Sequence, residues 1–159
     1  MIEKIDFDQL KVPGLSITFL IPDDEGVGPY LVDFSLWDEL IAILDFTVLW
    51  EVVYASDFIM PDTKKWSGYG PIIYANLESF FRKIWFRFIV GNNAPRVQRF
   101  FVNKMGRVLV LGNAQIAIAR WLNISSDYPF NTIKWLTDDS TDWLTRTTRK
   151  YHRQVFSHI

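Results

Sequence analysis

Cysteine is absent from the 159 residues of this chain. Its absence excludes disulfide bonds, a catalytic thiolate and metal sites that are built from cysteine. A chain of this length can bury one hydrophobic core without such cross-links. The absence is also compatible with a reducing compartment.

Charge of one sign is missing from two long stretches. No Lys or Arg occurs in residues 12–63, and no Asp or Glu occurs in residues 79–126. Residues 1–62 hold thirteen acids and two bases, a net charge of −11, whereas residues 63–159 hold fifteen bases and five acids, a net charge of +10. The two halves either neutralise each other inside the fold or present opposite charges to a charged partner.

A long uncharged hydrophobic run is also lacking. The most apolar window, residues 36–54, contains Asp38, Glu39, Asp45 and Glu51. A carboxylate at the centre of a membrane helix costs about 2.5–3.5 kcal/mol, so this window does not predict a membrane span. The first residues carry acids and no apolar stretch of signal-peptide length. We therefore expect a cytoplasmic protein without a membrane segment.

Alternating apolar residues predict a strand over residues 15–21, and residues 30–34 continue as a second strand. The acidic segment between them has turn composition, so a hairpin is expected. Ser35 as an N-cap and an apolar stripe from Trp37 to Leu44 predict a short helix. Residues 47–54 favour a strand, with continuation of the helix as the alternative.

The clearest element is a helix over residues 76–91, with Asn76 as its cap and Gly91 as its end. Residues 97–122 fit either helices or three tightly joined antiparallel strands, and we favour the β-meander. A C-terminal helix is expected from about Asp139. Together these elements predict a single α+β domain over residues 1–159, with an acidic part (1–62) and a basic part (63–159). Its antiparallel sheet, a hairpin plus a meander, would pack with two or three helices.

No motif predicts catalysis, a metal or a cofactor. Residues 138–142 superficially resemble the magnesium–diphosphate motif of prenyl synthases, but those enzymes need a large all-helical cavity, so we interpret the acids as a helix start. The three adjacent acids Asp23, Asp24 and Glu25 do not match the ligand spacing of a calcium loop. Residues 68–71, Gly-Tyr-Gly-Pro, lack the Lys-Ser/Thr of a P-loop and are interpreted as a turn.

A basic, aromatic-rich run covers residues 80–107 and suggests a nucleic-acid-binding accessory protein as an alternative function. The residues concerned would be Arg82, Arg87, Arg96 and Arg99. Most of the aromatic residues fall on the stripe expected to be buried, and the net charge of the chain is −1. Tight binding of nucleic acid is therefore not expected.

The favoured hypothesis is a non-enzymatic inhibitor of the immunity or antitoxin type, acting in bacterial competition. Its acids would cover a basic toxin domain, such as a nuclease, because carboxylates mimic phosphates and speed association. The predicted partner-binding residues are Asp23, Asp24, Glu25, Asp33, Asp38, Glu39 and Asp45. A small hydrolase with an unrecognised site is a further alternative. The sequence predicts neither the identity of the partner nor the oligomeric state.

Overall fold

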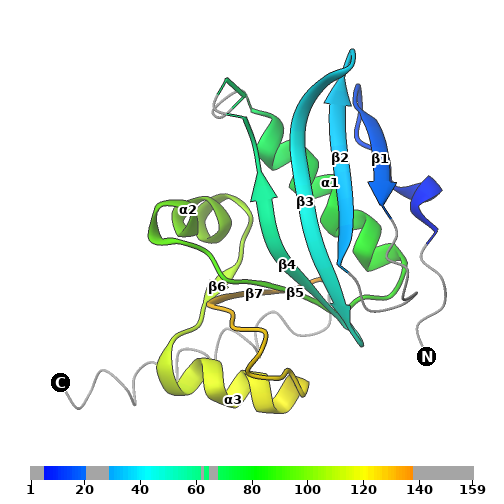
Figure 1. The fold of residues 1–159 in the computed structure, drawn as a ribbon. Helices are drawn as coiled ribbons and strands as arrows, with labels where there is room; N and C mark the ends of the chain where they lie inside the picture. Colours follow the sequence, from blue (N-terminus) through cyan, green and yellow to red (C-terminus); the bar gives the residue numbers. More distant parts are fainter. Residues whose placement is uncertain (1–5, 21–28, 62, 65–67, 138–159) are drawn as a thin grey trace.

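A computed structural model describes residues 6–20, 29–61, 63–64 and 68–137 of the chain. These residues form a seven-stranded sheet in the order β1-β2-β3-β4-β5-β7-β6, with helices packed against it (Figure 1). The predicted α+β class is confirmed. In the part of the chain that the structure describes, no helix has the length and apolar character needed to cross a membrane.

The first four strands are antiparallel neighbours that follow one another along the chain. A single 3₁₀ turn, η1 (Phe7–Gln9), precedes β1 (Ser16–Leu20), β2 (Tyr30–Leu36), β3 (Glu39–Leu49) and β4 (Val52–Ile59). The predicted hairpin of β1 and β2 is confirmed by their pairing. Its predicted acidic loop, residues 23–25, lies outside the described residues.

The helix predicted to start at Ser35 is wrong, because residues 35–44 turn from β2 into β3. Trp37 (φ 51°) and Asp38 (φ 64°) both adopt left-handed conformations between the paired residues Leu36 and Glu39. Two such residues make the tight turn whose twist matches a β-hairpin. The apolar residues that suggested a helix, among them Ile41 and Leu44, are buried on β3. This strand is paired with β2 on one side and with β4 on the other. The strand expected over residues 47–54 is in fact the end of β3, a second tight turn and the start of β4.

Helix α1 (Tyr69–Lys83) replaces the helix predicted over residues 76–91. Asn76 lies within the helix, where its side chain donates a hydrogen bond of 2.8 Å to the carbonyl oxygen of Ile72. The helix begins seven residues earlier because its buried stripe extends back to Ile73, and Pro71 is tolerated in the first turn. It ends before Trp85, whose φ of 75° cannot continue a right-handed helix.

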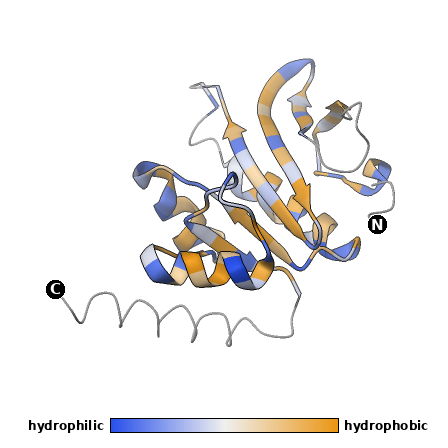
Figure 2. Cartoon of the chain, turned by 60° about the horizontal axis from the view of Figure 1, so that its bottom comes forward, coloured by the Kyte–Doolittle hydropathy of each residue, from blue (hydrophilic) through white to orange (hydrophobic). Residues whose placement is uncertain are grey.

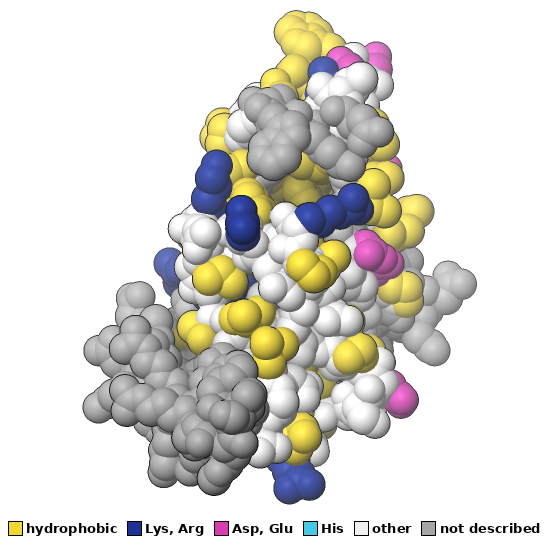
Figure 3. Space-filling view, turned by 90° about the vertical axis from the view of Figure 1, so that its left-hand side faces the viewer, with side chains coloured by type: hydrophobic (Ala, Val, Ile, Leu, Met, Phe, Trp, Pro, Cys, Tyr) yellow, Lys and Arg dark blue, Asp and Glu magenta, His cyan; other side chains and the backbone are white. Residues whose placement is uncertain are grey.

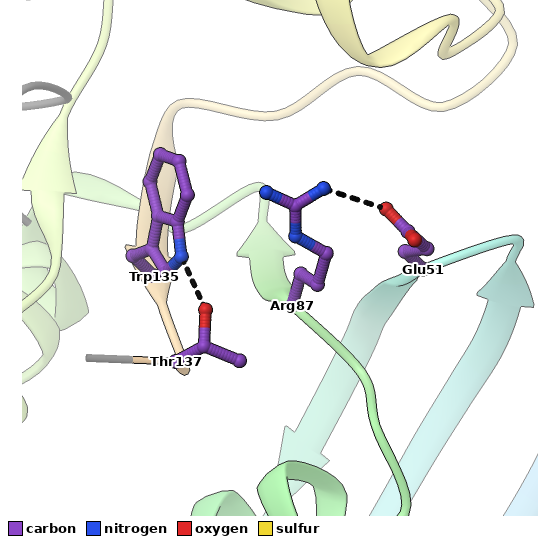
Figure 4. A network of polar contacts seen from close by, with 4 residues as sticks. All are labelled: Glu51, Arg87, Trp135 and Thr137. Carbon is purple, nitrogen blue, oxygen red and sulfur yellow. Dashed lines mark hydrogen bonds and ion pairs between the residues drawn. The ribbon is translucent and has the colours of Figure 1, made fainter. Parts of the chain in front are cut away.

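The chain after α1 returns as β5 (Phe88–Gly91), which pairs in parallel with β4 and antiparallel with β7 (Thr132–Trp135). The start of β5 is joined to the turn between β3 and β4, since Arg87 Nη1 lies 3.2 Å from Glu51 Oε2 (Figure 4). At the end of β7, Trp135 Nε1 donates a hydrogen bond of 2.5 Å to Thr137 Oγ1. The pairing of β4 with β5 joins the two parts of the sheet.

The predicted β-meander over residues 97–122 is wrong. Most of this segment is helical, comprising α2 (Pro95–Arg99), the π-helical segment η2 (Phe100–Lys104) and α3 (Gly112–Leu122). Only the short strand β6 (Val108–Leu109) joins the sheet, beside β7. Pro95 occupies the first turn of α2, where its fixed φ favours a helix. The C-terminal helix predicted from Asp139 lies outside the described residues.

Two hydrophobic cores fill the two faces of the sheet. The larger one lies between β1–β5 and α1 and includes Phe34, Phe46 and Phe81, all fully buried. The smaller one lies between β4, β5, β7 and α3 and includes Val90 and Ile133. Figure 2 shows the resulting hydrophobic stretches along the strands and along α3. The face of β1–β4 opposite α1 has no helix over it among the described residues (Figure 1).

Candidate active site

The first feature of the site is a separation of two parallel strands. β4 and β5 are paired from Val52 and Phe88 to Ala55 and Gly91, where β5 ends. β4 continues to Ile59 beside β3 only, so its last four residues have no neighbour from β5. Ligands of open α/β sheets bind at the carboxyl ends of parallel strands, where the chain leaves the sheet. This position is therefore the expected place for a ligand.

The N-terminus of α1 supplies the second feature. Gly68 precedes the helix with a φ of 89°, a conformation that favours glycine, and no side chain of a described residue caps the helix. The first turn also lacks an acidic residue. The first amides of a helix have no acceptor within the helix itself, and a helix N-terminus favours an anion such as phosphate.

Positive side chains accompany this helix end. Arg96 and Arg99 lie exposed on α2, the helix that follows β5. Figure 3 shows Lys and Arg side chains around the upper part of this face, next to a hydrophobic area. Of the four bases in the nucleic-acid hypothesis, Arg96 and Arg99 follow the end of β5, whereas Arg87 pairs with Glu51 at its start and Arg82 donates a hydrogen bond to the carbonyl oxygen of Leu136. An anionic ligand at the start of α1 would be attracted to Arg96 and Arg99.

Two carboxylates lie on the uncovered face of the sheet, close to the same separation. Asp45 on β3 and Asp57 on β4 are directly paired in the strand register. Ser56 is the extra residue of a β-bulge beside this pair, because Phe46 already pairs with Ala55. Partial burial raises the pKa of Asp45, and the neighbouring charge of Asp57 raises it further. A carboxylate with a raised pKa is better suited to accept a proton near neutral pH.

Tyr54 lies on the same side of β4 as Asp57. Its hydroxyl donates a hydrogen bond of 2.5 Å to the carbonyl oxygen of Pro129. Burial raises the pKa of Tyr54, and the charge of Asp57 adds to the shift. Tyr54 therefore remains protonated and holds the segment before β7 against the sheet.

The predicted partner-binding acids are placed in different regions. Asp33 and Asp45 project from neighbouring strands on the uncovered face, with Asp33 opposite Ile43. Asp38 and Glu39 lie at the far end of the β2–β3 hairpin, where Glu39 Oε1 is 3.0 Å from Lys64 Nζ. The predicted residues Asp23, Asp24 and Glu25 lie outside the described residues. The structure thus brings Asp33 and Asp45 onto one surface and separates Asp38 and Glu39 from them.

The start of α1 and the partner of Asp45 were not predicted from the sequence. Gly68-Tyr69-Gly70 was interpreted as a turn because it lacks the residues of a P-loop. A signal was present, however, because two glycines stand between a strand and an apolar helical stripe, which is the general order of phosphate-binding turns. Asp57 carried no signal, because its pairing with Asp45 depends on the bulge in β4.

A separate groove of about 830 Å³ lies between residues 7–19 and the second half of α1. Its lining is mixed, and its polar residues are Asp8, Gln9, Lys11, Asn76, Ser79 and Lys83. It lies by the C-terminal half of the helix and away from the ends of β4 and β5. We therefore place the candidate site at the strand separation and not in this groove.

Comparison with known proteins defines the fold. The sequence matches no family model and no curated protein. The structure is similar to GCN5 from Tetrahymena, with a TM-score of 0.56 and 11% identity over 68% of each chain. It is also similar to an acetyltransferase assigned to the GNAT family from Desulfovibrio desulfuricans, with a TM-score of 0.51 and 10% identity over 68% of this chain and 69% of that one.

A third similar structure is N-acetylglutamate synthase from Neisseria gonorrhoeae, complexed with coenzyme A and N-acetyl-glutamate. Its TM-score is 0.51 at 9% identity, over 67% of this chain and 26% of that one. The chain described here therefore has the fold of GNAT acetyltransferases.

This fold overturns the favoured functional hypothesis. The prediction of a non-enzymatic, immunity- or antitoxin-like inhibitor is wrong, because the structures that share the fold are acetyltransferases. The predicted partner, a basic toxin domain, is wrong for the same reason. The predicted role in bacterial competition is wrong as well. No sequence motif marks the candidate site, because the site consists largely of backbone amides and strand ends.

Proposed function

We propose that this protein is an acyltransferase that moves an acyl group from a coenzyme A thioester to an amine. The observation that carries the proposal is the separation of β4 and β5 beyond Ala55 and Gly91, with the start of α1, which no described side chain caps, as the next element after β4. The similar acetyltransferase structures support it, one of which contains coenzyme A.

The described residues fit a coenzyme A thioester. Its pyrophosphate would be held by the amides of Gly68, Tyr69 and Gly70 and by the positive end of the helix dipole. Arg96 and Arg99 on α2 would attract the remaining phosphate charge. The unpaired edge of β4 offers backbone groups to an extended, amide-containing arm, as an added strand would use them.

The paired acids supply the proton transfer. An amine must lose a proton to attack the carbonyl carbon of the thioester, and Asp57 is placed on the uncovered face where β4 leaves β5. Asp57 accepts this proton. Asp45 lies opposite it, and the pKa of Asp45 is raised by partial burial and by the charge of Asp57. The carbon–nitrogen bond forms, the carbon–sulfur bond breaks, and the thiol leaves with a proton.

The predicted acids Asp33 and Asp45 then acquire a new role in the proposal. Together with Asp57 they place negative charge across β2, β3 and β4 on the face from which the amine would approach. This charge would concentrate positively charged amines near the site. The acids predicted for partner binding thus become substrate-attracting residues, and a cytoplasmic location, where coenzyme A thioesters are made, is part of the same proposal.

Transfer is tested by mixing the protein with acetyl-CoA and a panel of primary amines that includes polyamines and a lysine-rich peptide. Free thiol is followed with a thiol reagent, and the acylated amine is identified by mass spectrometry. We expect thiol release that requires both substrates. Thiol release at the rate of the protein-free control with every amine would contradict the proposed function.

A further inference from the structure

Two exposed tryptophans occupy strained positions at one end of the sheet. Trp50 lies in the turn between β3 and β4 and is 70% exposed, and Trp85 lies in the link between α1 and β5 and is 84% exposed. Their φ angles, 56° and 75°, are left-handed. A bulky residue is rare in this conformation, which glycine and asparagine adopt more readily. Strained residues cluster at functional sites, and the proposed transfer uses neither tryptophan.

The two segments that carry these tryptophans are hydrogen-bonded to each other. The backbone amides of Arg87 and Phe88 donate hydrogen bonds of 2.8 Å and 3.2 Å to the carbonyl oxygen of Glu51. Glu51 directly follows Trp50, and Arg87 comes two residues after Trp85. The two indoles therefore project from neighbouring segments of the molecule.

A third tryptophan, on α3, extends the same surface. The ring centroid of Trp121 is 5.6 Å from that of Phe88, the first residue of β5, and half of the residue remains exposed. The β3–β4 turn and α3 both lie at the lower end of the molecule in Figure 1. We refer to the side chains of Trp50, Trp85 and Trp121 as the tryptophan surface.

Bases outnumber acids in the described segments that carry the tryptophan surface. The exposed bases are Arg82, Lys83, Arg87 and Arg120, and the exposed acids are Glu51 and Asp127. Arg87 pairs with Glu51, with Nη1 and Oε2 3.2 Å apart, so these two charges cancel. Arg82 and Lys83 in the last turn of α1 and Arg120 beside Trp121 leave an excess of positive charge.

The tryptophan surface lies away from the candidate active site. Lys83 is the last residue of α1, whereas the proposed phosphate contacts are at its first residue, Tyr69. A helix of this length spans about 22 Å. A partner that covers the tryptophan surface would therefore leave the start of α1 accessible.

The form of this surface favours a lipid bilayer over a folded protein as its partner. A stable protein interface needs a closely packed, complementary core, whereas these indoles project from separate segments of the chain. The interfacial region of a bilayer adapts to such side chains, and tryptophan is enriched there because its ring is apolar and its N–H is polar. Bases beside the rings would be attracted to anionic headgroups.

We propose that the tryptophan surface docks this protein on a membrane that contains anionic lipid. Trp50 and Trp85 insert among the headgroups, and the bases of α1 and α3 lie against the negative surface. The protein is held at the lipid–water interface and does not cross the bilayer. Docking in this orientation points the start of α1 away from the lipid. The proposal is independent of the proposed transfer.

The test is sedimentation of the full chain with vesicles of phosphatidylcholine, alone or with about one third phosphatidylserine. The double variant Trp50→Asn/Trp85→Asn removes both indoles, and asparagine tolerates the left-handed backbone. We expect the wild type to bind the anionic vesicles and the double variant to bind them at least about tenfold more weakly. Lys83→Gln and Arg120→Gln should each weaken this binding about fivefold.

Trp37→Asn is the matched control. Trp37 is 91% exposed and has a φ of 51°, but it lies in the β2–β3 turn beside the acids Asp38 and Glu39. We expect this variant to bind the anionic vesicles as the wild type does. An equal loss of binding in Trp37→Asn and in the double variant would overturn the proposed orientation.

Three further results would overturn the proposal. The first is absence of wild-type binding to the anionic vesicles, and the second is full binding by the double variant. The third is a wild-type dimer that the double variant dissociates in sedimentation velocity, because the surface would then be an interface between two copies. Quenching of wild-type tryptophan fluorescence by brominated lipid needs no variant. It is expected if the indoles insert, and its absence would also contradict docking.

Discussion

Asp45 and Asp57 are directly opposed on β3 and β4, so that two like charges face each other on the uncovered side of the sheet. The pKa of Asp45 is raised from its ordinary value of 3.8 by partial burial and by Asp57, and Oδ1 of Asp45 is buried without a partner among the described residues. Ionised Asp45 therefore opposes folding.

The pH dependence of stability follows from that raised pKa. Because folded Asp45 binds its proton more tightly than unfolded Asp45, its stabilising contribution is fully present below pH 3.8 and is lost as the pH rises through the folded pKa. We expect Asp45→Asn to raise the melting temperature at pH 7 and to raise it less, or not at all, near pH 4. An equal gain at both pH values would show that the carboxylate is not the cause.

Removal of the proposed proton acceptor should slow the transfer. We expect Asp57→Asn to lower kcat by roughly 10²–10⁴-fold, which is the usual contribution of general base catalysis. The affinity for coenzyme A should be unchanged, because Asp57 does not lie at the start of α1. Asp127→Asn, an exposed acid after α3, serves as the matched control in steady-state assays. A kcat for Asp57→Asn equal to that of the control would assign the proton transfer elsewhere.

Negative charge at the start of α1 should repel the donor. Tyr69 is the first residue of the helix and has no acid near it in the first turn. Tyr69→Glu places a charge where phosphate is proposed to bind, whereas Tyr69→Gln changes the size similarly without charge. We expect the glutamate variant to bind coenzyme A at least about tenfold more weakly than the glutamine variant, since like charges oppose each other across a helix N-terminus. Similar affinities of the two variants would place the phosphate elsewhere.

The revised bounds of α1 change the expected effect of core substitutions. Leu77 is fully buried within the helix, whereas Ile84 is only partly buried just beyond its end. Leu77→Ala should lower the free energy of unfolding by about 2–5 kcal/mol, as for other buried leucines. Ile84→Ala should cost less than Leu77→Ala. Urea denaturation of both variants measures the difference, and a larger loss at Ile84 would contradict the described end of α1.

Local patterns in the sequence predicted some of these elements and not others. The β1–β2 hairpin was predicted because alternation on both sides of a turn is a short-range signal. The segment from Trp37 to Leu44 was predicted as a helix because its apolar spacing fits the 3.6-residue period of a helix as well as the two-residue period of a strand. Pairing with β2 and β4 decides in favour of the strand. Phe88 continues the stripe of α1 in the sequence but belongs to β5, because Trp85 reverses the backbone.

Fewer features of the candidate site than of the fold could be predicted, because the residues of the site are far apart in the sequence. Asp57 meets Asp45 through strand register, and Ala55 meets Gly91 through the parallel pairing of β4 with β5. In the fold, the segregated charges lie on different elements. Acids lie on the uncovered face of β2–β4, and bases lie on α2 after β5.

Titration of the wild-type protein with coenzyme A in a calorimeter tests the central claim most directly. We predict binding of one molecule per chain with a dissociation constant of roughly 1 µM to 1 mM, the range typical of enzyme substrates. The affinity should weaken as salt increases, because Arg96, Arg99 and the helix N-terminus act on phosphate charge. No detectable binding at millimolar coenzyme A and low salt would contradict the account.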